Sequence, residues 1–504
     1  MSDAVRILLH PLGKTLEVPR GTPLSDILFL EGVEFPCGGR GRCRGCRVKV
    51  LEGELPATPE DLRLFKPEEL SAGWRMACRA VATGHLTLEL AQWEASILGD
   101  DTAFEFTPRP GWGVAVDLGT TTVVAQLLNL QTGQVLGVRT ALNVQARHGA
   151  DIMSRVQFGL TDQGLATLTH SIREQIGAMI GELVASSSVA AETLTDIVVV
   201  GNTVMHHLFC GLDPKPLSAY PFAPEQDGLQ EFAARDFGWQ WAADPTVRFL
   251  PCLGGFVGSD ILAGILATGM HRRDTLEVLL DLGTNGEMVV GNAERLLCAS
   301  TAAGPAFEGA RIAMGMRAAT GAISEVTVRD GRLHCQVFGH TEPRGICGSG
   351  LVDAVAAGLD LGEVQLSGRF AHKNQPWMLL PPVHLTQSDV RELQLAKGAI
   401  AAGIRILLDQ WGATLADVRR VHLAGAFGNY IKRSSARRIG LFAFDPERVE
   451  PAGNTALRGA KMALFTPGDS TFADLRRRCR QVSLSADPRF QEIYCEEMLF
   501  PEPS

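Results

Sequence analysis

Two segments of this chain share one pattern, and that pattern restricts the fold more than any other feature. The segments VAVDLGTTTVVAQLLNLQTGQV (114–135) and VLLDLGTNGEMVVGNAERL (278–296) are each an apolar strand that ends in Asp-Leu-Gly-Thr, a tight turn and a second strand. Their offset, 278 minus 114, is 164 residues, which is too long for a solenoid repeat. Strands alternate with helical stretches from residue 111 onward, which predicts an α/β architecture. The duplication predicts two lobes of related fold that face each other across a cleft.

The residues of the two hairpins are suited to binding a nucleotide triphosphate. An Asp at a strand end can hold hydrated Mg²⁺, and Asp117 and Asp281 stand at these ends. Glycine lets a turn approach a phosphate, while backbone N–H groups and Thr hydroxyls donate to its oxygens. One such turn alone can be an ordinary hairpin, but two copies predict a phosphate clamp. The predicted contact residues are Gly119, Thr120, Thr121 and Thr122 in the first hairpin and Gly283, Thr284, Asn285 and Gly286 in the second.

A third glycine turn follows an apolar strand in HLAGAFGNYI (422–431). The stretch resembles the adenosine-binding turn of the acetate and sugar kinase, Hsp70 and actin superfamily, and the order of the three motifs matches that superfamily. The resemblance implies ATP as the ligand. A P-loop is absent from the sequence, as is a G-x-G-x-x-G that opens a helix after a strand. The adenosine-contacting residues are expected to be Gly425, Ala426, Phe427 and Gly428.

Four cysteines near the N-terminus have the spacing of an iron–sulfur site, C-x5-C-x2-C-x31-C. They are Cys37, Cys43, Cys46 and Cys78. Three thiolates on one loop and a fourth after a long gap suit a single [2Fe-2S] cluster, and the intervening glycines bring backbone N–H groups toward its sulfides. A structural zinc site is the alternative, but zinc loops usually use paired C-x2-C knuckles. The loop is similar to the plant-type ferredoxin pattern with one extra residue between the first two ligands.

The elements around these cysteines make a small α+β unit of their own. Strands are expected at 5–9 and 15–18, a helix at 23–32 and a last strand at 85–90. We therefore predict four parts. They are a [2Fe-2S] ferredoxin domain (1–95), a short linker (96–110), a first ATPase lobe (111–274) and a second ATPase lobe (275–504).

Composition excludes some classes of partner. The net charge is −9, so no basic excess exists to meet nucleic-acid phosphates. No run of about 20 apolar residues appears, which predicts no membrane span. The N-terminal residues carry charges among apolar ones and do not resemble a signal peptide, so we expect a cytoplasmic protein. Seven further cysteines stand singly and are expected to be small buried apolar residues, and His206 and His207 are expected to pack rather than to bind a metal.

The combination resembles one family closely, the reductive activators of corrinoid-dependent enzymes. The resemblance covers nearly the whole chain and includes four long strings. These are N-x-Q-x-x-x-G-x-D-x-x-x-R from Asn143 to Arg155, GNTVMHHL (201–208), TAAGPAFEGARI (301–312) and GICGSGLVD (345–353). It implies a β-grasp ferredoxin domain followed by a two-lobed actin/Hsp70/acetate-kinase-like (ribonuclease H-like) ATPase. One departure is that better-known members have a separate linker domain, whereas only about 15–20 residues join the two parts here.

The family resemblance implies a specific reaction. It is the ATP-dependent return of a corrinoid (cobalamin-type) protein from Co(II) to Co(I), in support of a corrinoid methyltransferase or O-demethylase system. An external donor such as a reductase, ferredoxin or flavodoxin is implied, and a homodimer is compatible with the sequence. Two other functions stay open. One is the ATP-dependent activation of another low-potential enzyme such as a radical dehydratase, and the other is a redox sensor or scaffold without hydrolysis. The four-cysteine loop disfavours the first, and the two aspartates disfavour the second.

Overall fold

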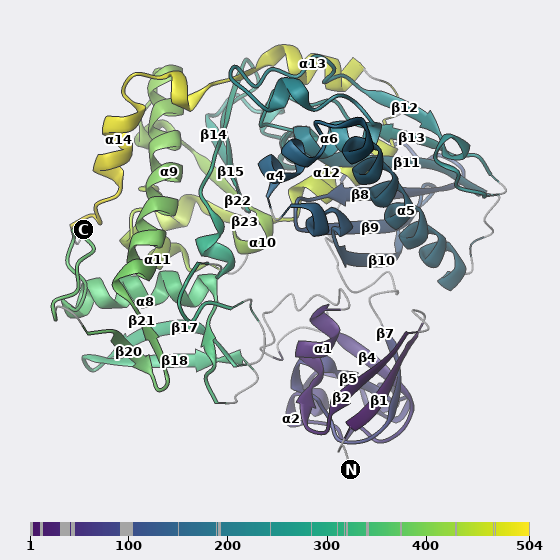
Figure 1. The fold of residues 1–504 in the computed structure, drawn as a ribbon, viewed down its shortest axis with the longest axis horizontal. Coiled ribbons are helices and arrows are strands. Elements are labelled where there is room, and N and C mark those ends of the chain that lie inside the picture. Colours follow the sequence, from purple (N-terminus) through teal and green to yellow (C-terminus); the bar gives the residue numbers. More distant parts are fainter. Residues whose placement is uncertain are drawn as a thin grey trace. The chain divides into compact units, whose positions relative to one another are not determined.

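The computed structural model divides the chain into two compact units (Figure 1). Unit 1 comprises Met1–Ala263 and Ala456–Ala473, and unit 2 comprises Gly264–Thr455 and Asp474–Ser504. The structure describes residues 4–10, 14–30, 41, 46–90, 104–149, 151–187, 189, 193–241, 243–283, 285–309, 311–316, 318, 321–338, 342–372, 375–428, 431–466, 468 and 470–502.

The N-terminal part of unit 1 is a five-stranded sheet in the order β2-β1-β7-β4-β5. Strand β1 pairs antiparallel with β2 and parallel with β7, the arrangement of a β-grasp fold. Alternation of apolar and polar residues buries one face of β1 and β7. The elements are β1 (Ala4–His10), β2 (Lys14–Pro19), α1 (Leu24–Leu30), β4 (Arg47–Glu52), α2 (Pro59–Leu64), α3 (Pro67–Ser71), β5 (Trp74–Met76) and β7 (Leu86–Leu90).

A buried carboxylate fixes the strand that leads to Cys78. Asp61 is fully buried, caps α2 together with Thr58, and accepts a 2.8 Å hydrogen bond from the backbone N–H of Met76. The Thr58 N–H and hydroxyl donate to its other oxygen at 2.8 and 2.9 Å, so the charge is well satisfied. The start of α2 therefore holds β5 in place, two residues before the cysteine.

The larger sheet of unit 1 has the order β10-β9-β8-β11-β13-β12. Strands β8, β9 and β10 form an antiparallel meander, and β11 and β13 continue parallel to β8. The long helix α5 packs on β9 and β10. The elements are β8 (Trp112–Leu118), β9 (Thr122–Asn129), β10 (Val135–Leu142), α4 (Ile152–Phe158), α5 (Asp162–Ser186), β11 (Leu194–Gly201), α6 (Thr203–Cys210), β12 (Gln230–Ala233), β13 (Thr246–Phe249), α7 (Ser259–Thr268) and α12 (Thr455–Leu464).

Five strands of the main sheet of unit 2 repeat that topology, whereas the sixth strand, β24, pairs at the opposite edge from β12. The order of this sheet is β23-β22-β14-β15-β16-β24, with an antiparallel meander β14-β15-β16 and with β22 and β23 parallel to β14. The duplicated hairpins thus lie at equivalent places in two related sheets, as the sequence predicts. The elements are β14 (Glu277–Leu282), β15 (Gly286–Gly291), β16 (Leu296–Thr301), β17 (Ala322–Arg329), α8 (Gly348–Leu361), α9 (Gln387–Trp411), β22 (Arg420–Ala424), α10 (Gly425–Gly428), α11 (Arg433–Arg438), β23 (Val449–Gly453), β24 (Cys479–Gln481) and α14 (Phe490–Glu497).

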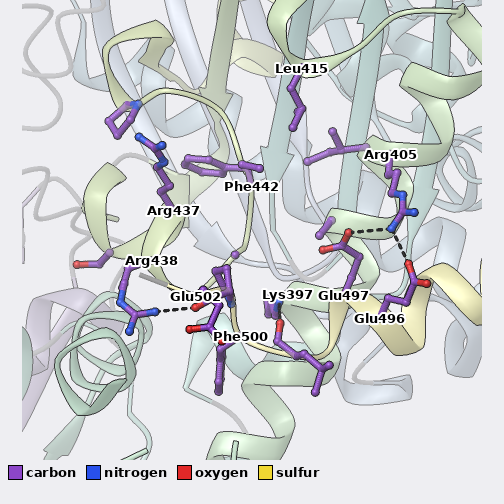
Figure 2. A pocket seen from close by; sticks show the side chains of 18 of the residues that line it. Lys397, Arg405, Leu415, Arg437, Arg438, Phe442, Glu496, Glu497, Phe500 and Glu502 are labelled. Carbon is purple, nitrogen blue, oxygen red and sulfur yellow. Dashed lines mark hydrogen bonds and ion pairs between the residues drawn. The ribbon is translucent and has the colours of Figure 1, made fainter. Parts of the chain in front are cut away.

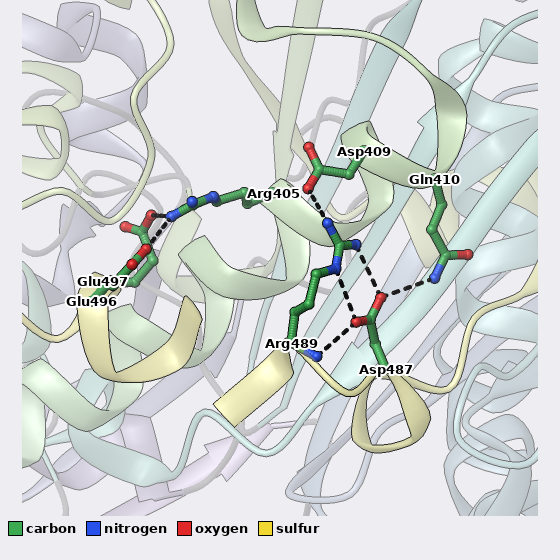
Figure 3. A network of polar contacts seen from close by, with 7 residues as sticks. All are labelled: Arg405, Asp409, Gln410, Asp487, Arg489, Glu496 and Glu497. Carbon is green, nitrogen blue, oxygen red and sulfur yellow. Dashed lines mark hydrogen bonds and ion pairs between the residues drawn. The ribbon is translucent and has the colours of Figure 1, made fainter. Parts of the chain in front are cut away.

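The C-terminal segment is bound to α9 by a set of charged side chains (Figure 3). Arg489 pairs with Asp487 at 3.2 Å and with Asp409 of α9 at 3.0 Å, and Arg405 of α9 pairs with Glu496 at 2.7 Å. These side chains are largely exposed, so each pair adds little stability. Their common effect is to orient α14 along α9. Among the described helices, none is long and apolar enough to cross a membrane.

Candidate nucleotide site and cluster loop

The first predicted phosphate turn in unit 1 is closed by its own backbone. The Gly119 N–H donates to the carbonyl of Thr122 at 3.0 Å, and a Cβ at Gly119 would lie 2.7 Å from that oxygen. Only glycine fits here without a backbone shift. Asp117 stands in β8 just before the turn and is half-buried.

Two asparagines far along the chain brace this turn, and the sequence analysis did not assign them a role. Asn143 donates from Nδ2 to the Gly119 carbonyl at 2.9 Å, and its backbone N–H donates to the Thr121 carbonyl at 2.9 Å. Asn202, the N-cap of α6, donates to Thr120 Oγ1 at 3.0 Å. Both asparagines are buried. They hold the turn from two sides.

A second carboxylate lies close enough to Asp117 for the two charges to interact. Asp260 stands in the first turn of α7, where its Oδ1 accepts the Ile261 N–H at 2.8 Å. Burial and, to a lesser extent, the negative charge of Asp117 raise the pKa of Asp260 to about 7. The start of α7 is tied to the end of β11, because Ser259 Oγ donates to the Gly201 carbonyl at 3.1 Å. Sequence reasoning missed Asp260, although the preceding glycines in LGGFVGSD mark a tight approach to a helix start.

In unit 2 the second phosphate turn meets the third glycine motif. Asp281 of β14 lies opposite Ala424 in the parallel β14–β22 register. Gly425 follows with φ +85°, and a Cβ placed there would lie 2.5 Å from Asp281 Oδ1 and 2.7 Å from the Leu282 carbonyl. The Gly283 N–H closes the second turn on the Asn285 carbonyl at 3.0 Å. Two motifs 144 residues apart, 425 minus 281, are therefore in direct contact.

The other predicted nucleotide contacts have different surroundings. Gly286 begins β15, and Gly428 ends the short helix α10. Phe427 is buried and stacks on Phe307 with ring centroids 4.6 Å apart. Thr284 lies outside the described residues, and the side chain of Ala426 is not described.

The structure describes two of the four predicted cluster ligands and brings them together. Cys46 and Cys78 are both buried, and the Ala77 N–H donates to the Cys46 carbonyl at 3.0 Å across β4 and β5. A pair of buried thiols, one just before β4 and one just after β5, suits two corners of an iron–sulfur cluster. Cys37 and Cys43 lie outside the described residues.

The two histidines pack as the sequence predicts. His206 Nε2 lies 3.1 Å from the Gly228 carbonyl, and His207 Nδ1 lies 2.9 Å from the Thr203 carbonyl. Both rings are buried in α6, and burial lowers the pKa of His207, so that ring is neutral at physiological pH.

A cavity of about 950 Å³ in unit 2 is separate from these motifs (Figure 2). It lies between α9, α11 and the C-terminal residues, with Lys397 at its wall. The Lys397 ammonium donates to the Leu499 carbonyl at 2.6 Å, and burial lowers the pKa of Lys397 to about 8. None of the predicted nucleotide residues lines this cavity.

Three family models match successive parts of the chain. Residues 7–83 match the family model of the 2Fe-2S iron–sulfur cluster binding domain. Residues 112–273 match the RACo middle region, and residues 275–504 match the C-terminal domain of RACo, described as the ASKHA domain. The three models together span most of the chain.

Two of three similar proteins cover the chain almost completely. The corrinoid activation enzyme RamQ of Eubacterium limosum is 29% identical over 589 aligned residues, covering 98% of this chain and 99% of the relative. A [Co(II) methylated amine-specific corrinoid protein] reductase of Methanosarcina barkeri is 28% identical, with 69% of each chain covered. The solved structure of a reductive activator for corrinoid, iron–sulfur protein superposes with a TM-score of 0.69 at 26% identity, covering 99% of this chain and 98% of the other.

Proposed function

Because the chain belongs to the RACo family of reductive activators, with a 2Fe-2S domain followed by an ASKHA domain, we propose that it uses ATP to return a corrinoid protein from Co(II) to Co(I). The observation that carries the proposal is the contact of Asp281 with Gly425, which joins a phosphate motif to an adenosine motif in a chain that also has the buried Cys46 and Cys78 pair. The activated corrinoid protein would serve a methyltransferase or O-demethylase system.

Four thiolates are proposed to hold the redox centre. Cys37, Cys43, Cys46 and Cys78 would bind a [2Fe-2S] cluster, which supplies single electrons at a potential near roughly −400 mV if it is of the plant type. The Co(II)/Co(I) couple lies lower still, so the transfer is uphill without assistance. A reductase, ferredoxin or flavodoxin is the proposed external donor, in the cytoplasm, with a homodimer as the proposed assembly.

Mg·ATP is proposed to bind through the two hairpins. Asp117 and Asp281 would hold the hydrated cation through its waters, and the turn N–H groups and Thr hydroxyls would donate to phosphate oxygens. Asp260 extends the carboxylate set of unit 1 and would become charged when the divalent cation enters. The braces from Asn143 and Asn202 keep the turn in shape before the nucleotide arrives, which lowers the entropic cost of binding.

ATP is proposed to make the activation cycle run in one direction, because the affinity of the activator differs between the two states of the corrinoid protein. An activator shifts the corrinoid equilibrium only by binding one state more tightly than the other. ATP binding or hydrolysis would then release the product complex, so the protein can act repeatedly.

The direct test is an absorption measurement on a purified Co(II) corrinoid protein under anaerobic conditions. With the loaded protein, a strong reductant and Mg·ATP, we expect the Co(I) spectrum to appear. Replacing ATP by ADP should stop its appearance. Equal Co(I) formation with ATP, with ADP and without nucleotide would contradict ATP-dependent activation.

Gly425→Ala tests the contact between the two motifs of unit 2. The new methyl group would meet Asp281 at 2.5 Å and would require a left-handed backbone, so Mg·ATP affinity should fall at least about tenfold. Gly412→Ala is a matched control, because Gly412 also has φ +85° but has nothing within 4 Å of its added Cβ. Isothermal titration of both variants should show lost affinity only in Gly425→Ala, and equal affinities would contradict this site.

The raised pKa of Asp260 predicts a pH-dependent response to Mg²⁺. With a pKa near 7 in the folded state and about 4 in the unfolded state, the folded protein binds an extra proton between these two pH values. The contribution of this group to stability therefore falls as pH rises from about 4 to 7 and is lost above that range. Mg²⁺ opposes that loss by neutralising the carboxylate. We therefore expect Mg·ATP to raise the melting temperature more at pH 8 than at pH 6. Asp260→Asn should flatten this difference, and an unchanged difference would exclude Asp260 from the site.

A further inference from the structure

Arg155 is a buried cation with an unused donor. It lies in α4 with no exposed surface, and its Nε donates to the Gly149 carbonyl at 2.9 Å. One terminal nitrogen lies 3.8 Å from Met205 Sδ, and the other has no hydrogen-bond partner within the described residues. Burying an unpaired charge is expensive, so a side chain of this kind calls for a specific explanation.

The local carboxylate compensates this charge only in part, because Asp151 attracts the guanidinium electrostatically without forming an ion pair with it. Asp151 caps α4, and its two oxygens accept from the Ser154 N–H at 2.9 Å and the Ser154 hydroxyl at 2.8 Å. Burial lowers the pKa of Arg155 to about 10, which still leaves the guanidinium charged at neutral pH. The positive charge is therefore present in the folded chain without an ion pair among the described residues.

The guanidinium is linked to the phosphate turn of unit 1 through Met205 and Asn143. The same Met205 sulfur that contacts Arg155 is 3.5 Å from Asn143 Nδ2, and that nitrogen donates to the Gly119 carbonyl at 2.9 Å. Arg155 is thus connected to the turn at 119–121 through Met205 and Asn143. A planar guanidinium is the side chain best suited to phosphate oxygens, because it offers several donors in a fixed fork.

We propose that Arg155 is a phosphate-binding residue of the nucleotide site, in which its unpaired N–H donates to a phosphate oxygen of the nucleotide held by the turn at 119–122. The inference rests on the proposed ATP binding and adds a residue to it. A purely structural arginine would tie Gly149 to α6 and would have no influence on how phosphates are recognised. Because the unpaired nitrogen is covered by protein atoms, contact with a phosphate requires the turn or the side chain to shift.

The test compares nucleotides that differ in their phosphates. For Arg155→Met in the full chain, we expect Mg·ATP to bind roughly ten- to a hundredfold more weakly, the usual range for a hydrogen bond to a charged group, with adenosine binding unchanged. Arg155→Lys keeps the charge but loses the fixed fork of guanidinium donors, so its Mg·ATP affinity should lie between those of the wild type and Arg155→Met. Arg173→Met is the matched control. Like Arg155, Arg173 donates to a backbone carbonyl, in this case that of Phe209 in α6 at 2.7 Å, and its guanidinium lies over the Phe237 ring. Its loss should therefore leave the ratio of ATP to adenosine affinity unchanged.

If the variants do not fold, hydrogen exchange of the wild-type chain tests whether Arg155 contacts the phosphates. Mg·ATP should protect the backbone at 149–158 beyond the level that adenosine produces, because only the phosphates engage Arg155. Equal protection by the two ligands, or an Arg155→Met variant with the wild-type affinity for Mg·ATP, would overturn this inference and leave the proposed function intact. A wild-type chain that binds no nucleotide would overturn both.

Discussion

Asp117→Ala should reduce ATP hydrolysis by at least about a hundredfold while the visible absorption of the iron–sulfur cluster stays the same. Asp117 ends β8 directly before the braced turn at 119–122 and acts on the pKa of Asp260 through its charge. Without it, one of the two carboxylates that would hold Mg²⁺ in unit 1 is missing, and metal-assisted stabilisation of phosphoryl transfer is worth several kcal/mol. Asp281→Ala should give the same result from unit 2.

The control for this loss is an aspartate outside the turn. Asp162 is exposed at the start of α5, and Asp162→Ala should keep the wild-type rate of phosphate release. The measurement is corrinoid-stimulated phosphate release, with the cluster spectrum recorded on the same sample. A normal rate in Asp117→Ala would show that the first hairpin does not bind the nucleotide.

The duplicated hairpins could be predicted because their signal is local. A strand that ends in Asp-Leu-Gly-Thr specifies its own turn, and two copies predict two similar sheets, which the structure confirms for five of the six strands in each. The ferredoxin fold could be predicted for the same reason, since loop spacing and strand alternation are both short-range patterns.

The parts of the site that were missed depend on contacts between distant residues. Asn143 reaches the Gly119 carbonyl 24 residues away, Asn202 reaches Thr120 82 residues away, and the charge of Asp117 in β8 acts on Asp260 in α7. Nothing near Asn143 in the sequence says which turn it supports. The packing of Ala456–Ala473 with unit 1 likewise depends on contacts between distant residues. An amphipathic helix such as α12 shows that it has an apolar face but not which sheet it covers.

The single cysteines show that residue type alone does not predict burial at every position. Single cysteines are expected to be buried, and Cys210, Cys252, Cys298, Cys347 and Cys479 are. Cys335 is partly buried, and Cys495 is exposed on α14. Burial also raises the pKa of Cys210 and of Cys252, so these two thiols stay protonated and are poor ligands for a metal.

Cys46→Ser should abolish Co(I) formation and leave ATP hydrolysis in place. Cys46 is fully buried beside Cys78, and a serine hydroxyl is a poor replacement for a thiolate ligand, so the iron content should drop with the visible absorption. The phosphate turns and Gly425 belong to other sheets and do not depend on this thiol. The expected result is corrinoid-stimulated phosphate release at the wild-type rate without a Co(I) spectrum.

Cys495→Ser separates loss of a ligand from loss of any thiol. Cys495 is exposed, so its replacement should leave iron content, Co(I) formation and hydrolysis unchanged. About two irons per chain in the wild type and in Cys495→Ser, with loss in Cys46→Ser, would agree with a [2Fe-2S] centre. Zinc in a fully loaded, anaerobically purified wild-type sample would contradict it. Full Co(I) formation by Cys46→Ser with a protein donor would contradict the proposed role of this cluster as the electron carrier.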